Sequence, residues 1–307
     1  MSINSYQFTR LSKTIELIRY IGKINRRGSV AVFDLEDCYS IPFRRLESNK
    51  LRAKARKSIH TFLTGDIDFA GITIGIRINS IDDQNFKKDI NLLNTINGKI
   101  NWDCIFLPKT ETRAQILKCI RILKKNKIKF GEVIPIVESR KGIKNLEIIL
   151  ASRTRKIFSR VAFGHCDYYL DCGIFPFPHH NSPSFWDKTK KIIKIIEKRG
   201  YTFVNSPVLE LTNTRLFNKT LSKLKKTCKK EFSQVTLNLH QSQLCRDFKK
   251  AFRVKLPEQK EFNPRQILSA YLSNIISGRS FVVTRREKKI ISPQEYIAAV
   301  NYLKIKF

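Results

Sequence analysis

Acidic residues stand at the ends of several short apolar runs in this chain, where they could bind a metal ion and a substrate. The runs read AVFDLED (31–37), CIFLPKTE (104–111), EVIPIVE (132–138) and RVAFGHCD (160–167). A fifth run, ITIGIRIN (72–79), ends in an arginine and an asparagine instead. Carboxylates are scarce in the chain, with 26 Asp and Glu against 59 Lys and Arg. Their placement after strand-like runs therefore indicates a site that needs them, and Mg²⁺ prefers such oxygen ligands.

Strands that alternate with helices must position these residues. The apolar runs are short and rich in β-branched residues, which predicts strands buried on both faces. Further candidate strands are SYQFTR (5–10), 201–208 and 235–240. Helical patterns, with apolar residues three or four positions apart, lie between the strands at 86–96, 111–126, 142–157, 184–200 and 214–230. Seven or eight such units predict a parallel barrel or a doubly wound sheet.

The polar strand ends favour the barrel. In a parallel barrel the carboxyl ends of all the strands converge on one mouth, whereas an open sheet uses a single switch point. The chain also lacks the GxGxxG and GxxxxGKS/T motifs of nucleotide-binding open sheets. We therefore predict an α/β fold, with a (βα)8 TIM barrel over residues 1–240 and an appended C-terminal helical segment over 241–307. In that segment the patterns predict helices at 242–252, 264–278 and 292–303 and a short strand at 281–286.

Bulk composition indicates a cytoplasmic protein without disulfide bonds. No apolar run approaches the roughly 20 residues that span a bilayer, and the N-terminus lacks the apolar region of a signal peptide. The seven cysteines include no CxxC pair. Several of them lie inside apolar patterns, where a reduced thiol behaves as a small hydrophobe.

The formal net charge of +33 favours anionic partners,. The excess of Lys and Arg is spread over both halves of the chain, and Lys, Ile and Asn are used heavily together, as AT-rich coding bias also produces. A plain solvated surface therefore explains the charge. A nucleotide-bearing substrate, such as a coenzyme A thioester, and RNA are the alternatives. RNA is the less favoured because few aromatic residues interleave with the lysines.

The order of the motifs resembles one known family. The segments VFDLED, LRAKAR, IRIN, LPKTE, IVES with Gly142, and FGHCDYYLDCG, from about residue 30 to 173, are similar to the citrate lyase β-subunit-like proteins. These belong to the HpcH/HpaI aldolase superfamily, which includes malyl-CoA and citramalyl-CoA lyases. The resemblance implies a (βα)8 barrel that binds Mg²⁺ and cleaves or forms a carbon–carbon bond next to a carboxylate. It also implies a homo-oligomer, a trimer or hexamer, whose C-terminal segment packs on a neighbouring subunit.

Two carboxylates and one arginine match the family's central positions. Glu138 and Asp167 fall on its metal ligands, although either could instead stabilise the start of the following helix. Arg77 matches the arginine that binds a substrate carboxylate or oxyanion, which a planar guanidinium can do with two parallel hydrogen bonds. A salt bridge from Arg77 to local carboxylates is compatible with that role.

Further residues are expected to support the site. By resemblance, Glu36 and Asp37 orient the arginine and the metal's waters. Strand parity places Asp34 on the side opposite to Asp37, unless a bend of the chain undoes it. Lys109 and Glu111 match a substrate-binding PKxE motif, and Glu111 could equally begin the next helix.

Histidines near the family aspartate are expected to have structural roles. His165 and Cys166 replace small residues that usually precede this aspartate, and we expect His165 to pack or hydrogen-bond rather than bind metal. His179 and His180 are expected in a loop near the mouth.

One family residue is missing. The related lyases carry an aspartate shortly before their final helix as general acid/base, and Ser292 stands in its place. Ser292-Pro293-Gln294-Glu295 reads as a capping box with proline at the first helical position. A serine exchanges no proton near neutral pH without an activating base, so the usual proton transfer has no assigned group.

These observations predict a Mg²⁺-dependent carbon–carbon lyase or aldolase that acts on a hydroxy-acyl compound through an enolate stabilised by metal and arginine. The alternative is a catalytically retired barrel that binds RNA or another polyanion through its basic surface.

Overall fold

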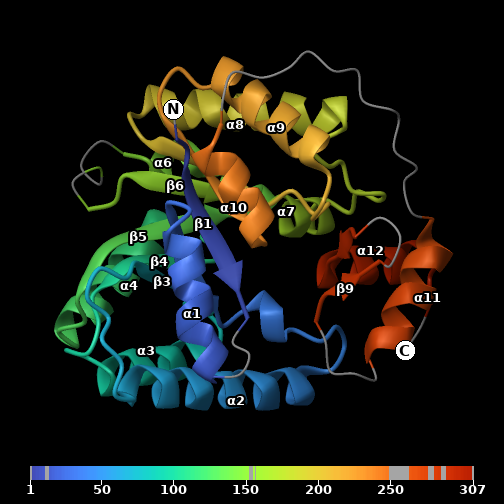
Figure 1. The fold of residues 1–307 in the computed structure, drawn as a ribbon. Helices are drawn as coiled ribbons and strands as arrows, with labels where there is room; N and C mark the ends of the chain where they lie inside the picture. The colour runs from blue at the N-terminus through green and yellow to red at the C-terminus, as the bar shows by residue number, and fades with distance from the viewer. Residues whose placement is uncertain are drawn as a thin grey trace.

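The computed structural model describes residues 2–10, 14–151, 155, 157–248, 263–275, 280–284 and 288–305. Eight parallel strands close into a barrel in sequence order, and β8 pairs with β1 to complete it (Figure 1). The strands are β1 (Asn4–Thr9), β2 (Ser29–Asp34), β3 (Ile74–Arg77), β4 (Trp102–Leu107), β5 (Phe130–Val137), β6 (Arg160–Phe163), β7 (Thr202–Asn205) and β8 (Phe232–Thr236). The predicted (βα)8 TIM barrel is confirmed, including the weak first strand.

Helices follow the strands on the outside of the barrel. They are α1 (Thr14–Asn25), η1 (Asp37–Tyr39), α2 (Arg45–Thr64), α3 (Asn85–Thr95), α4 (Arg113–Lys125), α5 (Arg140–Lys144), α6 (Leu146–Ile149), α7 (His165–Asp171), α8 (Pro183–Lys198), α9 (Thr214–Thr227) and α10 (Leu239–Arg246). The helix predicted at 142–157 forms as two short pieces that end at Ile149, and residues 152–154 and 156 lie outside the described part.

The strands are apolar on both faces because each face meets a different core. Inward-facing side chains fill the barrel and include Tyr6, Val32, Phe106, Ile134 and Val235. Alternate residues face outward and join the apolar faces of the surrounding helices in a larger cluster. This two-sided burial accounts for the near-continuous apolar runs in the sequence.

Local sequence sets where several helices begin. The Thr112 hydroxyl accepts the amide of Gln115 in a capping box at the start of α4, and Asn213 accepts the amide of Leu216 at the start of α9. These side chains satisfy amide groups that have no partner within the helix. They hold the preceding strand-to-helix loops at the carboxyl end of the barrel.

The C-terminal segment lies beside the barrel mouth. It comprises α11 (Pro264–Ile275), the antiparallel pair β9 (Val282–Val283) and β10 (Ile290–Ile291), and α12 (Pro293–Tyr302). The rings of Tyr271 and Tyr296 stack with centroids 4.4 Å apart inside a small separate core. Figure 1 shows α12 next to α7, and these two helices are in contact. The segment therefore covers the mouth of its own barrel.

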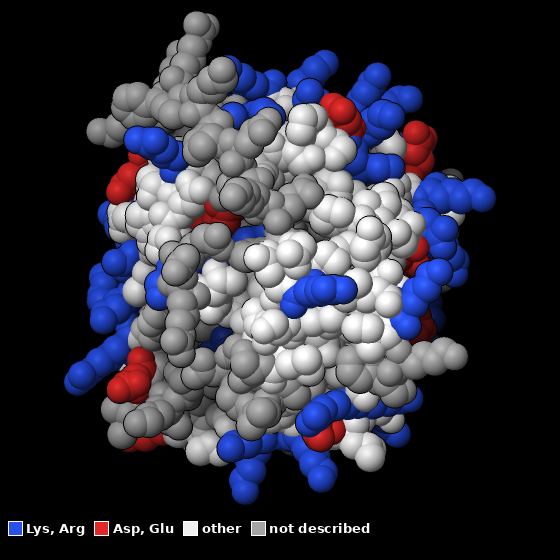
Figure 2. Space-filling model, turned by 90° about the vertical axis from the view of Figure 1, so that its right-hand side faces the viewer, with Lys and Arg blue, Asp and Glu red and all other residues white. Residues whose placement is uncertain are grey.

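Parts of the helices and the strand predicted in the C-terminal segment fall outside the described residues, namely 249–252, 276–278 and 285–286. The predicted domain boundary at residue 240 lies inside α10, which packs against β1 and β8; the division into 1–240 and 241–307 stays a prediction. On the face in Figure 2, Lys and Arg lie mainly near the edge, and the centre is largely uncharged. No helix of the described chain is long and apolar enough to cross a membrane.

Candidate active site

A cavity of about 230 Å³ opens at the carboxyl ends of the barrel strands. Its wall carries Asp34, Asp37, Arg77, Glu138 and Asp167, which come from the ends of β2, β3, β5 and β6. The barrel thus brings together five charged residues that are spread over more than 130 positions of the sequence. Convergence at this end is what a parallel barrel imposes on strand-end residues.

Arg77 is held by three carboxylates. Its Nε and Nη2 donate to the two oxygens of Asp34 at 2.7 and 2.6 Å, and Nη1 donates to Asp37 at 2.9 Å. Glu36 Oε2 lies 3.1 Å from Nη1, an ion pair without hydrogen-bond geometry. A guanidinium has five N–H groups, so two remain beyond the three bonds above. Arg77 can therefore be fixed by the protein and still bind a ligand.

Asp34 is a site residue that the sequence interpretation missed. Its carboxylate accepts hydrogen bonds from the backbone N–H groups of Glu36 (3.0 Å) and Cys38 (3.0 Å). These bonds bend the chain into η1 directly after the strand. This bend breaks the strand alternation, so Asp34 and Asp37 contact the same arginine. Of the two arrangements that the sequence left open, the structure therefore shows the bend and not the opposite sides given by strand parity. Although burial opposes ionisation, Arg77 keeps the pKa of Asp34 below its usual value.

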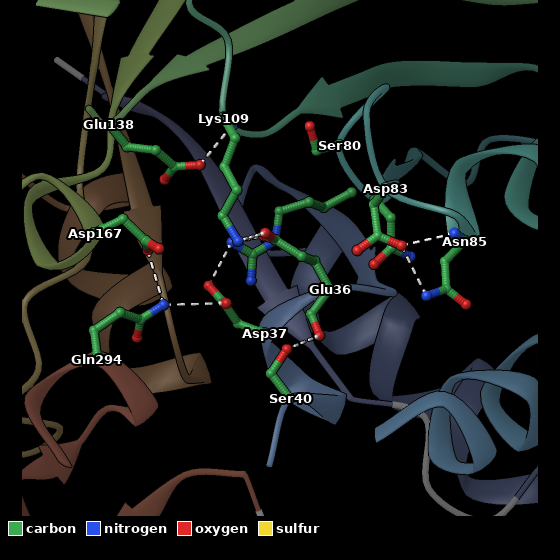
Figure 3. Close-up of polar contacts among 12 residues, drawn as sticks. Glu36, Asp37, Ser40, Ser80, Asp83, Asn85, Lys109, Glu138, Asp167 and Gln294 are labelled. Atoms are coloured by element: carbon green, nitrogen blue, oxygen red, sulfur yellow. Dashed lines mark hydrogen bonds and ion pairs between the residues drawn. The ribbon is translucent and has the colours of Figure 1, made fainter. Parts of the chain in front are cut away.

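Lys109 links two of the acidic residues. Its ammonium lies 2.8 Å from Glu36 Oε1, and its backbone N–H donates to Glu138 Oε1 at 2.7 Å (Figure 3). The residue has a φ of 53°, in the left-handed region that non-glycine residues adopt at a cost,. The neighbouring Glu36 raises the pKa of Lys109 well above its usual value, so the side chain is a stable cation.

Glu138 and Asp167 both line the cavity, as the metal prediction requires. Burial, followed by the charge of Asp167, raises the pKa of Glu138 well above its usual value. Burial, followed by the charge of Asp37, raises the pKa of Asp167 to about 7. Two buried carboxylates that resist ionisation are typical of a functional site, and a divalent cation would favour their charged forms.

Neither Glu138 nor Asp167 is the N-cap of the following helix, although Asp167 lies in the first turn of α7, where a negative charge stabilises the helix start,. Ser139 caps α5 through the amide of Gly142, and Gly164 is the cap residue of α7. Gly164 also leaves room for the carboxylate, because an added Cβ would overlap Glu138 Oε2.

Gln294 joins the C-terminal segment to the site and was not expected from the sequence. Its amide nitrogen donates to Asp167 Oδ2 at 2.8 Å and to Asp37 Oδ1 at 3.2 Å. Figure 3 shows Gln294 reaching from the tail toward both carboxylates. Gln294 lies 257 positions from Asp37, and a glutamine at the second position of a helix carries no signal of such a contact.

Ser292 forms the predicted capping box at the start of α12. It accepts the amide of Glu295 at 3.1 Å, while Glu295 Oε2 accepts the amide of Ser292 at 2.9 Å. Pro293 occupies the first position of α12. Ser292 lines the cavity, but its hydroxyl is engaged as a helix cap.

Glu111 lies apart from the other predicted residues. It accepts a hydrogen bond from Ser139 at 2.8 Å and pairs with Lys141 at 2.9 Å, just before α4. Its contact with Lys141 lowers its pKa. Glu111 is not among the residues that line the mouth cavity, and its assignment to substrate stays a prediction.

A chain of hydrogen bonds runs beside the cavity. His165 Nε2 is 3.1 Å from His179 Nδ1, and His179 Nε2 is 3.0 Å from Glu295 Oε1. Burial, followed by the charge of His179, lowers the pKa of His165 well below its usual value. His165 therefore packs and hydrogen-bonds, as expected, and helps to fasten α12 to the barrel.

The residues present fit a magnesium ion. The described chain holds no cluster of three His, Cys, Asp or Glu side chains that could enclose a metal. Magnesium does not need one, because it usually binds to one or two carboxylates and keeps several water or substrate oxygens. Glu138 and Asp167 supply such a pair beside an open cavity.

Fold and site together define a (βα)8 barrel with an acidic, arginine-containing mouth. The chain belongs to the HpcH/HpaI aldolase/citrate lyase family, whose sequence model matches residues 29–219. Among curated protein sequences, none matches the chain.

Solved structures of low sequence identity share the fold. Haloferax volcanii malate synthase, in a ternary complex with pyruvate and acetyl-CoA, superposes with a TM-score of 0.75 at 12% identity, covering 99% of this chain and 90% of that one. The Mycobacterium tuberculosis citrate lyase beta subunit with oxaloacetate and magnesium gives 0.60 at 16%, covering 80% and 96%. RipC from Yersinia pestis gives 0.58 at 17%, covering 80% and 94%. The likeness to these structures shows the barrel fold.

Proposed function

We propose that the protein is a Mg²⁺-dependent carbon–carbon lyase or aldolase that cleaves or forms a hydroxy-acyl compound, with a coenzyme A thioester as the candidate acyl part. The observation that carries the proposal is the pair Glu138 and Asp167 beside Arg77 in one cavity. Two similar folds were solved with magnesium and oxaloacetate, or with pyruvate and acetyl-CoA, which supports this class of ligand.

Glu138 and Asp167 would hold the ion, which supplies Lewis-acid polarisation of the substrate carbonyl when bound. Arg77 binds the substrate carboxylate or developing oxyanion through its two remaining N–H groups. Asp34, Asp37 and Glu36 fix its orientation.

Lys109 and Gln294 position the carboxylates. Lys109 connects Glu36 to Glu138, and Gln294 connects Asp37 to Asp167. By holding the tail over the cavity, Gln294 also limits water access, which strengthens electrostatic interactions inside. Ser292 serves the helix cap, and no proton transfer is assigned to it.

The proposal also covers the oligomeric state and the cellular location of the protein. We infer a cytoplasmic homo-oligomer, a trimer or hexamer, in which the segment 241–307 also contacts a neighbouring subunit. Size-exclusion chromatography with light scattering tests this part, and a monomer at micromolar concentration would contradict it.

The metal assignment is tested by titrating Mg²⁺ into the wild-type protein and the variant Asp167→Ala, with calorimetry as the readout. We expect the affinity of the variant to fall by at least about 100-fold, the upper end of the effect of outer-shell partners. Mg²⁺-dependent turnover of hydroxyacyl-CoA thioesters should be abolished as well.

Glu132→Gln is the matched control, because Glu132 is a carboxylate at the opposite end of the barrel, paired with Arg160. It should bind Mg²⁺ like the wild type. Undiminished binding by Asp167→Ala would refute the metal assignment.

A further inference from the structure

The charged residues of the mouth cavity lie on one side of its wall, where Ile136, Ala162 and Phe163 of β5 and β6 also line it. The charged arc comprises Asp34, Asp37, Arg77, Glu138 and Asp167, from the ends of β2, β3, β5 and β6. The apolar arc comprises Pro207, Leu209, Val235, Leu237 and Ile290, together with Phe8, whose ring lies 5.0 Å from the Arg77 guanidinium and forms the border with the charged arc. Apart from Ile290, these residues lie in β7, β8 and β1 or in the loops that follow them. These three strands are consecutive in the closed sheet. Ile290 comes from β10 and closes the apolar arc from the tail side.

Within the described lining, the cavity has no cation available for a second carboxylate. Arg77 is the positively charged residue in the described lining of the cavity, and it already faces three carboxylates. The ammonium of Lys109 is engaged by Glu36. A carboxylate placed against the apolar arc would be desolvated without an ionic partner, which costs several kcal/mol or shifts its pKa.

The polar groups within the apolar arc are neutral. Asn205 and Ser206 line the cavity at the end of β7, and Asn205 Oδ1 and Ser206 Oγ are buried without a hydrogen-bond partner among the described residues. Asn205 Nδ2 is engaged by Gln234 Oε1 at 2.8 Å. The free amide oxygen is an acceptor and disfavours an anion. The pair fits one neutral hydrogen-bonding group, such as a hydroxyl, or an ordered water.

The cavity is larger than a small polar head group needs. Its volume of about 230 Å³ compares with the roughly 10–15 Å³ that one water requires on the same measure. Each buried CH₂ group contributes about 0.8 kcal/mol of hydrophobic free energy. An apolar side chain of several carbons therefore gains affinity in the space beside Val235, Leu237 and Ile290.

We propose that the keto-acid part of the substrate is a monocarboxylic α-keto acid with a branched apolar side chain. Its carboxylate and carbonyl lie in the charged arc, and its side chain lies against the apolar arc. The proposal rests on the proposed function, because that function places the keto-acid head at Glu138, Asp167 and Arg77. It adds a selectivity against dicarboxylic acids that the proposed function does not require.

The test is a calorimetric titration of the full chain in Mg²⁺ with five acids. These are α-ketoisovalerate and α-ketoisocaproate, with apolar side chains; oxaloacetate and α-ketoglutarate, with a second carboxylate; and pyruvate as the head group. We expect both branched acids to bind at least about tenfold more tightly than either dicarboxylic acid, which corresponds to about 1.4 kcal/mol. They should also bind more tightly than pyruvate, because they bury more CH₂ and CH₃ groups.

A charge placed on the apolar arc should invert this order. Leu237→Arg adds a cation at a half-buried lining position, and it should raise the affinity for α-ketoglutarate and lower that for α-ketoisocaproate. Leu46→Arg is the matched control, because Leu46 is 78% exposed on α2 and does not line the cavity. It should keep the wild-type order. If Leu237→Arg fails to fold, the wild-type series alone decides.

The outcomes separate the two proposals. Dicarboxylic acids that bind as tightly as the branched acids would overturn the inference and leave the proposed function standing. Failure of all five acids to bind in Mg²⁺ would overturn both.

Discussion

The two ends of the barrel hold cavities of similar size, but the carboxylates in the two cavities are paired differently. The cavity at the amino ends, of about 220 Å³, is lined by residues that include Asp103, Glu132 and Arg160. There Glu132 pairs with Arg160 and accepts the Ser159 hydroxyl at 2.9 Å, and Asp103 accepts the amide of Ile74 at 2.6 Å. At the mouth, four carboxylates line the cavity with one arginine.

The difference separates carboxylates that are paired within the fold from those that we propose to bind a ligand. At the amino end each carboxylate has a partner from a neighbouring strand or loop, so the arrangement is complete without a ligand. At the mouth, burial and mutual repulsion raise the pKa of Glu138 and Asp167, and a cation from outside the chain would relieve this. The same residue types therefore support the fold at one end and form the proposed reaction site at the other.

The largest contrast is expected for the two arginines. Arg77→Ala would leave Asp34 and Asp37 buried without their cation and should lower the free energy of unfolding by about 3–5 kcal/mol,. Arg160→Ala breaks a pair whose arginine side chain is 31% exposed, and should cost about 0–1 kcal/mol. Urea denaturation of both variants measures the difference. Equal losses would remove the distinction between the two ends.

A second contrast is the pH dependence of metal-free protein. The pKa of Asp167 is about 7 in the folded state against an ordinary 3.8, so between these values the folded state binds more protons than the unfolded state. Stability should therefore fall as pH rises from about 4 to about 7. Urea denaturation in a chelating buffer measures this slope.

Asp167→Asn removes one of the titrating groups and should make the decline shallower, while Glu138, whose pKa is also raised, keeps part of it. Glu132→Gln, at the amino end, should keep it. A wild-type slope in Asp167→Asn would show that another group causes the decline.

The smallest contrast concerns hydrogen bonds that neutral side chains donate to carboxylates. Gln294→Ala deprives Asp37 and Asp167 of an amide donor and should lower the free energy of unfolding by about 1–2 kcal/mol. Ser159→Ala, at an exposed position of the amino end, should change it by less than about 0.5 kcal/mol. Thermal unfolding of the two variants compares them. If Gln294→Ala leaves the free energy of unfolding unchanged, the tail is held over the mouth by its apolar contacts alone.

Much of the site could be predicted because barrel geometry is regular. Glu138, Asp167 and Arg77 each follow or end an apolar strand, and parallel strands of a closed barrel end at one mouth. Strand parity could not place Asp34, because parity ends where the strand ends. The amides of Glu36 and Cys38 donate to the Asp34 carboxylate, and the chain bends there. Nothing in the local pattern around Glu111 distinguishes a cavity position from the loop position that it occupies.

The sequence by itself determined the alternation of strands and helices, the barrel, the capping box at Ser292 and the family. These follow from local periodicity, local hydrogen bonding and short motifs. Only the tertiary structure decided that Gln294 bridges two carboxylates, that Arg77 is shared among three, and that the cavity wall has a charged and an apolar arc. These depend on contacts between residues far apart in the chain, which form only when the closed barrel and its C-terminal segment come together.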